Sequence, residues 1–307
     1  MSAQPRVGII IYHAHAWDDM LEYVLQVEAA GFERVFLGDT LVHPFTEEAW
    51  FDAWSVLPAL AQATQRIRVG TLVTSIVNRN PAMLAQQAVT VNHISGGRLD
   101  LGIGSGGHPS CHSMTGTPMW PLRERIDRLG EFVAIVDEML RGEVTSYQGT
   151  HYQIQEARLP RPIELPRPRL WIAAERPRAL RIAAKHADAW VFTDSEYKPG
   201  AVRKLDEIRA LNERLDELAS EAGRDPASIE RWMLSGYSER TAFRSIHELH
   251  DLMGEFGALG IKNFVFTYQP DGPSEIVLPS KYKPAYHQFL HHPDRLQELA
   301  EALKLSS

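Results

Sequence analysis

The chain has 307 residues, and its 32 basic and 39 acidic side chains give a net charge of −7 at pH 7. This balance, with a pI near 6.0, is not typical of nucleic-acid-binding proteins. The sequence is 44% hydrophobic and 23% charged, as in a globular protein, and has no apolar run long enough to cross a bilayer. The single cysteine, Cys111, excludes an internal disulfide, and no secretory signal is visible, so we expect a cytoplasmic protein.

Short runs rich in Val, Ile, Leu and Phe recur along the chain, and most of them are followed by a helical pattern. The eight expected strands cover residues 7–12, 34–37, 67–73, 99–103, 170–173, 189–192, 231–235 and 263–267. Apolar strands that alternate with helices indicate parallel pairing between buried strands. Eight such units predict an α/β fold, a closed (β/α)₈ TIM barrel that occupies residues 1–307 as one domain.

Several helix ends carry sequence signals. Asp18 or Asp19 is expected to cap a helix that stops at Gly31, and Asn80 followed by Pro81 predicts the start of another helix. Further helices are expected over residues 121–141, 177–186, 201–222 and 247–259, with one or two more near the C-terminus.

The connection between the fourth and fifth strands contains an insertion, residues 142–169. Its prolines predict an extended path near the barrel mouth rather than a helix. The insertion could serve as a lid over a site or as a structural cover for the barrel, and the sequence leaves both interpretations open.

Polar residues follow the strands where a barrel of this kind places its active site, at the carboxyl ends. His13, Asp39 and His108 are the candidate catalytic residues, because imidazole and carboxyl groups can transfer protons near neutral pH. Two alternatives remain: Asp39 could only cap the segment after its strand, and the histidines could be solvated loop residues.

Two segments at the same edge are suited to an anionic ligand. The first is the glycine-rich loop after the fourth strand, where the backbone can approach a ligand closely. The second is the start of the helix after the fifth strand, where unpaired amides and two guanidinium groups favour phosphate. The candidate cofactor-binding residues in these segments are Gly104, Ser105, Gly106, Ala174, Glu175, Arg176 and Arg178.

A metal-dependent hydrolase is a weaker alternative. His13 and His15 have the spacing found in metal-dependent amidohydrolases, and imidazole is a good zinc ligand. The positions after the fifth, sixth and eighth strands, however, lack the further ligands that such barrels need. No metal is therefore expected.

Several segments carry a family resemblance. They are AGFERVFLGD at 30–39, RVGT at 68–71, RNPAMLA at 79–85, ISGGRLDLGIGSG at 94–106 and ERPRALRIAA at 175–184. With these segments the chain resembles the bacterial luciferase-like family of flavin- or deazaflavin-dependent oxidoreductases, also called luciferase-like monooxygenases. The block at 94–106 is the most specific of them.

The resemblance implies the same barrel with an insertion between strands four and five. It also implies a cofactor, FMN or coenzyme F420 in reduced form, whose phosphate would sit at 175–178. The ring would lean on strand three near Thr71 and Leu72, where family members often hold a non-proline cis peptide. The implied activity is monooxygenation with FMNH₂ and oxygen, or hydride transfer with coenzyme F420, on a small organic substrate.

The sequence departs from the best-known deazaflavin branch at three positions. Thr40 and Gly107 stand where many of those members have a histidine and an acid, which puts a sugar-phosphate dehydrogenase in doubt. Glu175 adds a negative charge near the expected phosphate, although Arg176 and Arg178 could offset it. A non-catalytic flavin-binding protein of the same fold is therefore a further alternative.

The resemblance also suggests partners. A monooxygenase of this kind would need a separate flavin reductase, and a homodimer is expected. Trp50, Phe51 and Trp54 could form a dimer face or pack within the barrel. Neither nucleic acid nor a membrane is an expected partner.

Overall fold

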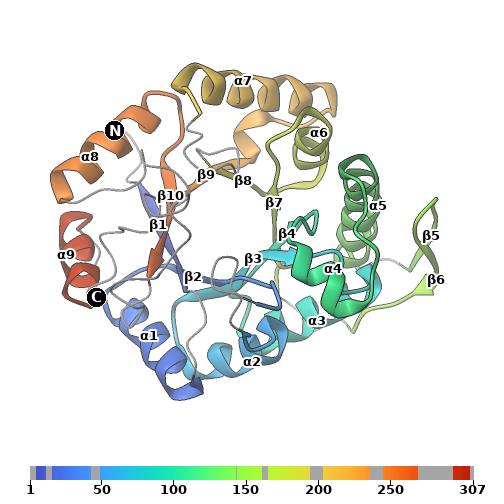
Figure 1. Cartoon of the computed structure of the whole chain (residues 1–307), viewed down its shortest axis with the longest axis horizontal. Coiled ribbons are helices and arrows are strands. Elements are labelled where there is room, and N and C mark those ends of the chain that lie inside the picture. Colours follow the sequence, from blue (N-terminus) through green and yellow to red (C-terminus); the bar gives the residue numbers. More distant parts are fainter. Residues whose placement is uncertain are drawn as a thin grey trace.

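The computed structural model describes residues 5–11, 16–42, 49–142, 144–160, 165–193, 203–235, 245–268 and 293–304. Parallel strands close into a barrel in the order β1-β10-β9-β8-β7-β4-β3-β2 (Figure 1). Their bounds are Arg6–Ile11 (β1), Arg34–Leu37 (β2), Arg68–Ser75 (β3), Leu99–Gly104 (β4), Arg169–Ala173 (β7), Ala189–Thr193 (β8), Glu230–Leu234 (β9) and Asn263–Tyr268 (β10).

The predicted (β/α)₈ barrel is confirmed. Strand bounds agree with the expected runs to within two residues, because most strand positions are buried on both faces and therefore read as continuous apolar segments. Inside the barrel, the aromatic rings of Phe36, Trp171 and Trp232 pack with Ile10 and Leu72 into an apolar layer.

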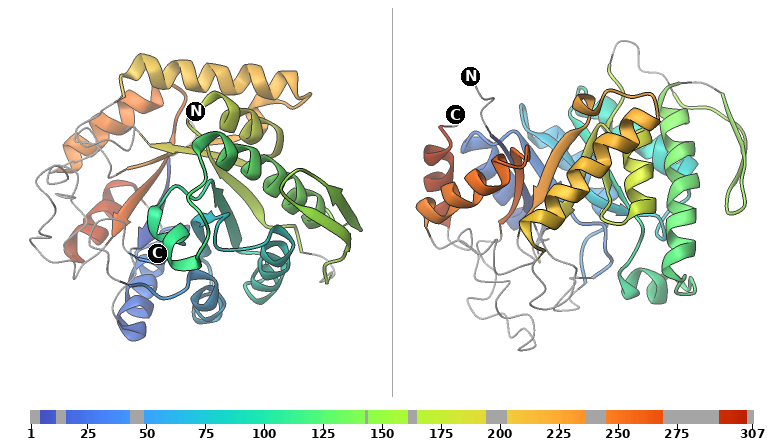
Figure 2. Two further views of the ribbon diagram at one scale, coloured as in Figure 1. Left: turned by 45° about the vertical axis from the view of Figure 1, so that its right-hand side comes forward. Right: turned by 90° about the horizontal axis from the view of Figure 1, so that it is seen from above.

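The helices surround the barrel as an outer ring (Figures 1 and 2). Their bounds are Trp17–Ala29 (α1), Ala53–Ala63 (α2), Pro81–Ile94 (α3), Pro109–Thr115 (α4), Leu122–Leu140 (α5), Pro177–His186 (α6), Leu205–Glu221 (α7), Ile246–Gly257 (α8) and Pro293–Ala302 (α9). No helix in the described part of the chain is both long and apolar enough to span a bilayer.

One of the predicted helix caps is wrong and the other is confirmed. The N-cap of α1 is Ala16, which makes no side-chain cap, and Asp18 and Asp19 lie in the first turn. There their charges favour the helix dipole instead of accepting a capping hydrogen bond. At α3 the Asn80 side chain accepts from the Ala82 amide at 2.9 Å, with Pro81 in the first turn as expected.

The insertion forms an antiparallel hairpin of β5 (Thr145–Gln148) and β6 (Gln153–Ala157). Figure 1 shows it on the outer side of α5, away from the barrel. The Glu131 carboxylate of α5 accepts three backbone hydrogen bonds from the hairpin turn, residues 150–152. Residues 144–160 therefore lie on the outer side of α5. The expectation that the insertion runs near the barrel mouth, together with its interpretation as a lid, is wrong for this part of the insertion.

Candidate functional site

Asp39 lies just after β2 and is buried beneath the carboxyl edge of the barrel, with 3% of its surface exposed. Its Oδ1 accepts from Arg79 Nη2 at 2.6 Å, and its Oδ2 accepts from the Ser75 amide at 3.2 Å. The same Arg79 nitrogen also contacts Asp52 at 2.8 Å. Asp39 therefore ties the end of β2 to the end of β3, and both of its oxygens are engaged.

The electrostatics of Asp39 are unusual for a carboxyl group. Burial raises the pKa of Asp39 to about 6, and Asp52 adds to the rise while Arg79 opposes it. Such a group can hold a proton close to neutral pH, as the candidate assignment requires. Its burial and its two partners, however, keep it from facing an open site directly.

The other two candidate catalytic residues are histidines. His13 lies outside the described residues. His108 is the N-cap of α4, and its Nδ1 faces the Ser110 hydroxyl at 2.7 Å and the Ser110 amide at 3.4 Å. His108 is half-buried at the end of the loop that follows β4. It therefore lies next to the candidate site, while its Nδ1 is engaged at the start of α4.

Strand β3 carries the expected ring contacts, Thr71 and Leu72. The Leu72 side chain joins the apolar layer inside the barrel, whereas Thr71 is buried in the wall, where its hydroxyl donates to the Gly102 carbonyl at 3.1 Å. A non-proline cis peptide joins Leu72 to Val73, and the register with β4 shifts between Thr71 and Thr74. The structure thus places Leu72, but not the Thr71 side chain, on the inner face.

The loop after β4 requires its glycines. A Cβ at Gly104 would collide with Val73, and Gly106 has a φ of 66° and lies against Val77 and Ser75. Ser105, between them, is half-buried. The loop therefore brings backbone, with little side-chain cover, to the edge of the barrel.

At the start of α6, Glu175 is turned toward β8. Its Oε1 accepts from the amide and the hydroxyl of Thr193, each at 2.8 Å, and its Oε2 pairs with Arg203 at 2.9 Å. The expectation that Arg176 and Arg178 offset this charge is wrong for Arg178, which pairs with Asp127 of α5. Arg203, which sequence reasoning missed, neutralises Glu175 instead.

The helix start itself matches its expected geometry. Ala174 ends the strand run, and its carbonyl accepts from the Trp190 indole at 2.6 Å. Arg176 is the N-cap of α6, and its side chain makes no capping hydrogen bond, so it leaves the first amides of the helix free of a cap from their own N-cap residue.

Arg125, in the first turn of α5, is a second residue that sequence reasoning missed. Its Nη1 lies 3.5 Å from the Gly106 carbonyl, and its Nε is buried with no hydrogen-bond partner among the described residues. It has no ion pair among the described residues, and burial lowers the pKa of its guanidinium. A Cβ at Gly107 would lie 2.9 Å from Nη1, so the glycine at that position makes room for the cation.

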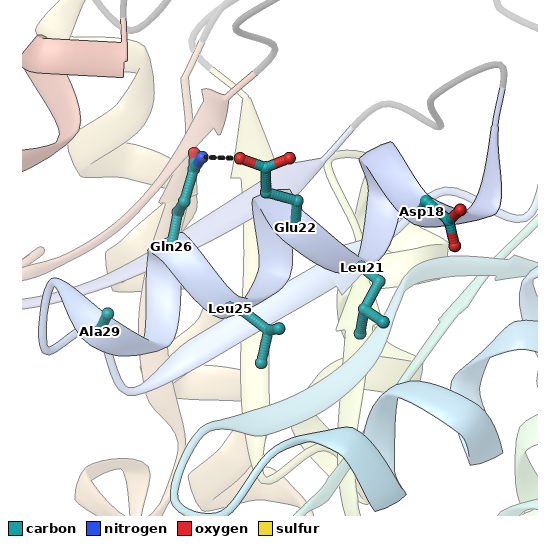
Figure 3. Close-up of a pocket in the computed structure, with 6 residues that line it drawn as sticks. All are labelled: Asp18, Leu21, Glu22, Leu25, Gln26 and Ala29. Carbon is teal, nitrogen blue, oxygen red and sulfur yellow. Dashed lines mark hydrogen bonds between the residues drawn. The ribbon is translucent and has the colours of Figure 1, made fainter.

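A hollow of about 410 Å³ lies elsewhere, on the outer face of α1. Figure 3 shows its lining, which comes from this single helix: Asp18, Leu21, Glu22, Leu25, Gln26 and Ala29. No strand end contributes to this lining, so the hollow is not the candidate site. Among the described residues no three His, Cys, Asp or Glu side chains group as metal ligands, and His13 and His15 lie outside them.

The aromatic residues considered for a dimer face do not share one surface. Trp54 is buried, and its indole donates to Thr74 at 3.0 Å, while Trp50 packs against Gly38 and Phe51 is exposed. The homodimer stays a prediction.

The comparisons with known proteins agree with this architecture. The family model described as luciferase-like monooxygenase matches residues 1–304, so the chain belongs to that family. It is 30% identical over 182 residues to an F420-dependent glucose-6-phosphate dehydrogenase of Amycolatopsis mediterranei, which covers 58% of this chain and 54% of the relative. The chain therefore spans about half the length of that curated relative.

Solved structures share the fold. An F420-dependent secondary alcohol dehydrogenase in complex with an F420-acetone adduct superposes with a TM-score of 0.74 at 19% identity, covering 98% of this chain and 99% of that one. A monooxygenase of Streptomyces bottropensis superposes with a TM-score of 0.71 at 18% identity, covering 98% and 97%.

Proposed function

We propose that this protein is an oxidoreductase that binds coenzyme F420 and transfers a hydride between it and a small alcohol or carbonyl compound. The similarity to the dehydrogenases named above supports the deazaflavin and the substrate class. The observation that carries the proposal is Arg125, a half-buried cation without a counter-ion in the described chain, beside the glycine loop at the carboxyl edge of the barrel.

The residues present fit such a cofactor. Arg125 offers a guanidinium that has no ion pair among the described residues, and the start of α6 offers amides that its N-cap side chain leaves uncapped. Asp127 of α5 pairs with Arg178 of α6, so these two helix starts lie together at one edge. Because Glu175 is already neutralised by Arg203, it need not repel a phosphate there.

Each remaining part of the site has a role in this proposal. When bound, the deazaflavin would supply a carbon centre that accepts or donates a hydride. Leu72 would support the ring from inside the barrel, and the loop at Gly104–Gly106 would allow close backbone approach. Asp39 would hold the strand ends in place and keep a titratable proton near them.

The test is a fluorescence titration of the purified protein with coenzyme F420 and, separately, with FMN. We expect Arg125→Met to weaken F420 binding roughly tenfold to hundredfold, because a charge-assisted hydrogen bond is worth about 1.5–3 kcal/mol. Arg123→Met is the matched control, since Arg123 is an exposed arginine in the same turn with no described partner. If the Arg125→Met variant bound F420 as tightly as wild type, Arg125 would not be part of the cofactor site.

The same titration, together with assays of oxygen consumption and of turnover, separates the alternative functions. Binding of FMN alone, with oxygen consumption that depends on a separate flavin reductase, would replace the proposal with the monooxygenase reaction. Tight binding without turnover on alcohols and ketones would favour the non-catalytic flavin-binding protein. If neither cofactor bound, the proposal would fail.

A further inference from the structure

Glu175 is a carboxylate that stands directly before the helix start where the proposed function places a phosphate. The next residue, Arg176, is the N-cap of α6. The hydrogen bonds that Glu175 makes with described residues all lead to other elements: Oε1 accepts from the amide and the hydroxyl of Thr193 at the end of β8, and Oε2 accepts from Arg203. The carboxylate is therefore held toward β8 rather than toward the helix that follows it.

The start of α6 would attract this carboxylate if it were released. The first amides of an α-helix have no intrahelical acceptor, and the Arg176 side chain leaves those of α6 uncapped. Hydrogen bonds from such amides and the helix dipole stabilise any anion at a helix N-terminus, whether it is a carboxylate or a phosphate. A released Glu175 side chain would therefore compete with an anionic ligand for α6.

Arg203 supplies the charge that balances Glu175. Its Nη2 lies 2.9 Å from Glu175 Oε2, and the two side chains are only 13% and 14% exposed. Among the described residues, Arg203 and Glu175 form no other ion pair. Thr193 contributes two neutral donors, which position one carboxylate oxygen but do not balance its charge. The position of the Glu175 carboxylate therefore depends on Arg203.

We propose that Arg203 is a positioning residue of the anion site: by pairing with Glu175 it holds that carboxylate against β8 and keeps the start of α6 open to a phosphate group. Arg203 acts through Glu175 and need not touch the ligand. It also stands directly before Lys204, the N-cap of α7, so the ion pair joins the starts of two neighbouring helices. The place of the anion at α6 rests on the proposed function, whereas the pairing of Arg203 with Glu175 does not.

Two other roles of Arg203 lead to different results. If Arg203 held the anion directly, neutralising Glu175 would not replace the lost cation. If Arg203 only braced the fold, neutralising Glu175 would not repair the anion site. Positioning through Glu175 predicts that a second substitution, Glu175→Gln, restores binding, because the glutamine oxygen can still accept from Thr193 but carries no charge.

The first measurement is F420 affinity by fluorescence titration. We expect Arg203→Met to bind about tenfold more weakly than wild type, and the double variant Glu175→Gln, Arg203→Met to return to within about threefold of wild type. Arg203→Lys keeps the charge and should bind like wild type. Arg209→Met is the control, since Arg209 is an exposed arginine of α7 that pairs with Asp206 at 2.5 Å.

The double variant decides the outcome even if Arg203→Met does not fold. Affinity close to wild type in a protein that lacks Arg203 supports positioning through Glu175. A double variant that binds at least tenfold more weakly than wild type, or an Arg203→Met variant that binds like wild type, would overturn the role of Arg203 while F420 binding itself stands.

The second measurement uses inorganic phosphate, which does not require the rest of the cofactor. We expect phosphate to raise the thermal unfolding midpoint of wild type and of the double variant by more than that of Arg203→Met, because a ligand of the folded state stabilises it. This order in a protein that binds no F420 would support the role of Arg203 and contradict the proposed function. If wild type bound neither F420 nor phosphate, both would fail.

Discussion

At the scale of single residues, Asp39 makes stability depend on pH in a direction opposite to most carboxylates. Its pKa in the folded chain is about 6, above the value of roughly 3.9 expected when unfolded. The folded state therefore binds the proton more tightly, so this contribution to stability is fully present below about pH 4 and is lost as the pH rises through 6. Asp52, whose pKa is lowered by Arg79 and Ser55 despite its burial, acts with the opposite sign.

We predict that Asp39→Asn removes this dependence. The unfolding free energy of wild type relative to the variant should fall by on the order of 2 kcal/mol between pH 4 and pH 7, as measured by urea unfolding. Asp52→Asn, which changes the other partner of Arg79, should give a difference that rises over its own titration range. A difference between wild type and Asp39→Asn that stayed flat from pH 4 to pH 7 would contradict the raised pKa.

At the scale of elements, a chain of hydrogen bonds supports the irregular part of β3. The Trp54 indole of α2 donates to Thr74, Thr74 donates to Thr71 at 2.8 Å, and Thr71 donates to the Gly102 carbonyl of β4. This chain crosses from a helix through two strands at the point where the register shifts. The conformation around Leu72 therefore depends on α2 as well as on the sheet.

We predict that Trp54→Phe destabilises the protein by about 1–2 kcal/mol, because it keeps a ring in place but removes the buried donor to Thr74. It should also weaken F420 binding, since Leu72 lies within the supported segment. Urea unfolding and the fluorescence titration measure the two effects. Trp17→Phe, a half-buried tryptophan whose indole has no described partner, is the control, and equal losses in both variants would argue against the hydrogen-bond chain.

The elements that the sequence predicts well are those defined by local pattern. Apolar runs indicate the barrel strands, and Asn80 with Pro81 marks a helix start. The β5–β6 hairpin is missed because its residues are mostly exposed and lack an apolar run. Arg125, Arg203 and the partners of Asp39 are missed for a different reason: they act through contacts between distant parts of the chain, which no local spacing reveals.

At the scale of the whole molecule, the amino-terminal end of the barrel is closed by charges rather than by apolar side chains. The residues of this ionic layer stand at or next to the first positions of their strands: Arg6, Arg34, Arg68, Asp100, Arg169 and Glu230. Glu230 pairs with Arg6 at 2.9 Å and with Arg169 at 2.7 Å. Arg34 also lies 5.1 Å from the Trp232 ring, which links the ionic layer to the apolar layer above it.

Asp100 is the most deeply buried member of this layer. Its side chain is fully buried and accepts from Arg34 Nε at 3.1 Å and from Arg68 Nε at 2.9 Å. Removing one partner of a buried ion pair leaves the other charges uncompensated and costs about 3–5 kcal/mol. Because the layer joins strands from both sides of the barrel, this cost should appear as a loss of global stability.

We therefore predict that Asp100→Asn lowers the urea midpoint by an amount equivalent to about 3–5 kcal/mol. Glu33→Gln is the matched control, because Glu33 also pairs with Arg34, at 2.9 Å, but is 58% exposed. An exposed pair contributes about 0–1 kcal/mol, so this variant should stay close to wild type. If the two variants lost the same stability, the arginines at the base of the barrel would have to be satisfied by solvent rather than by Asp100.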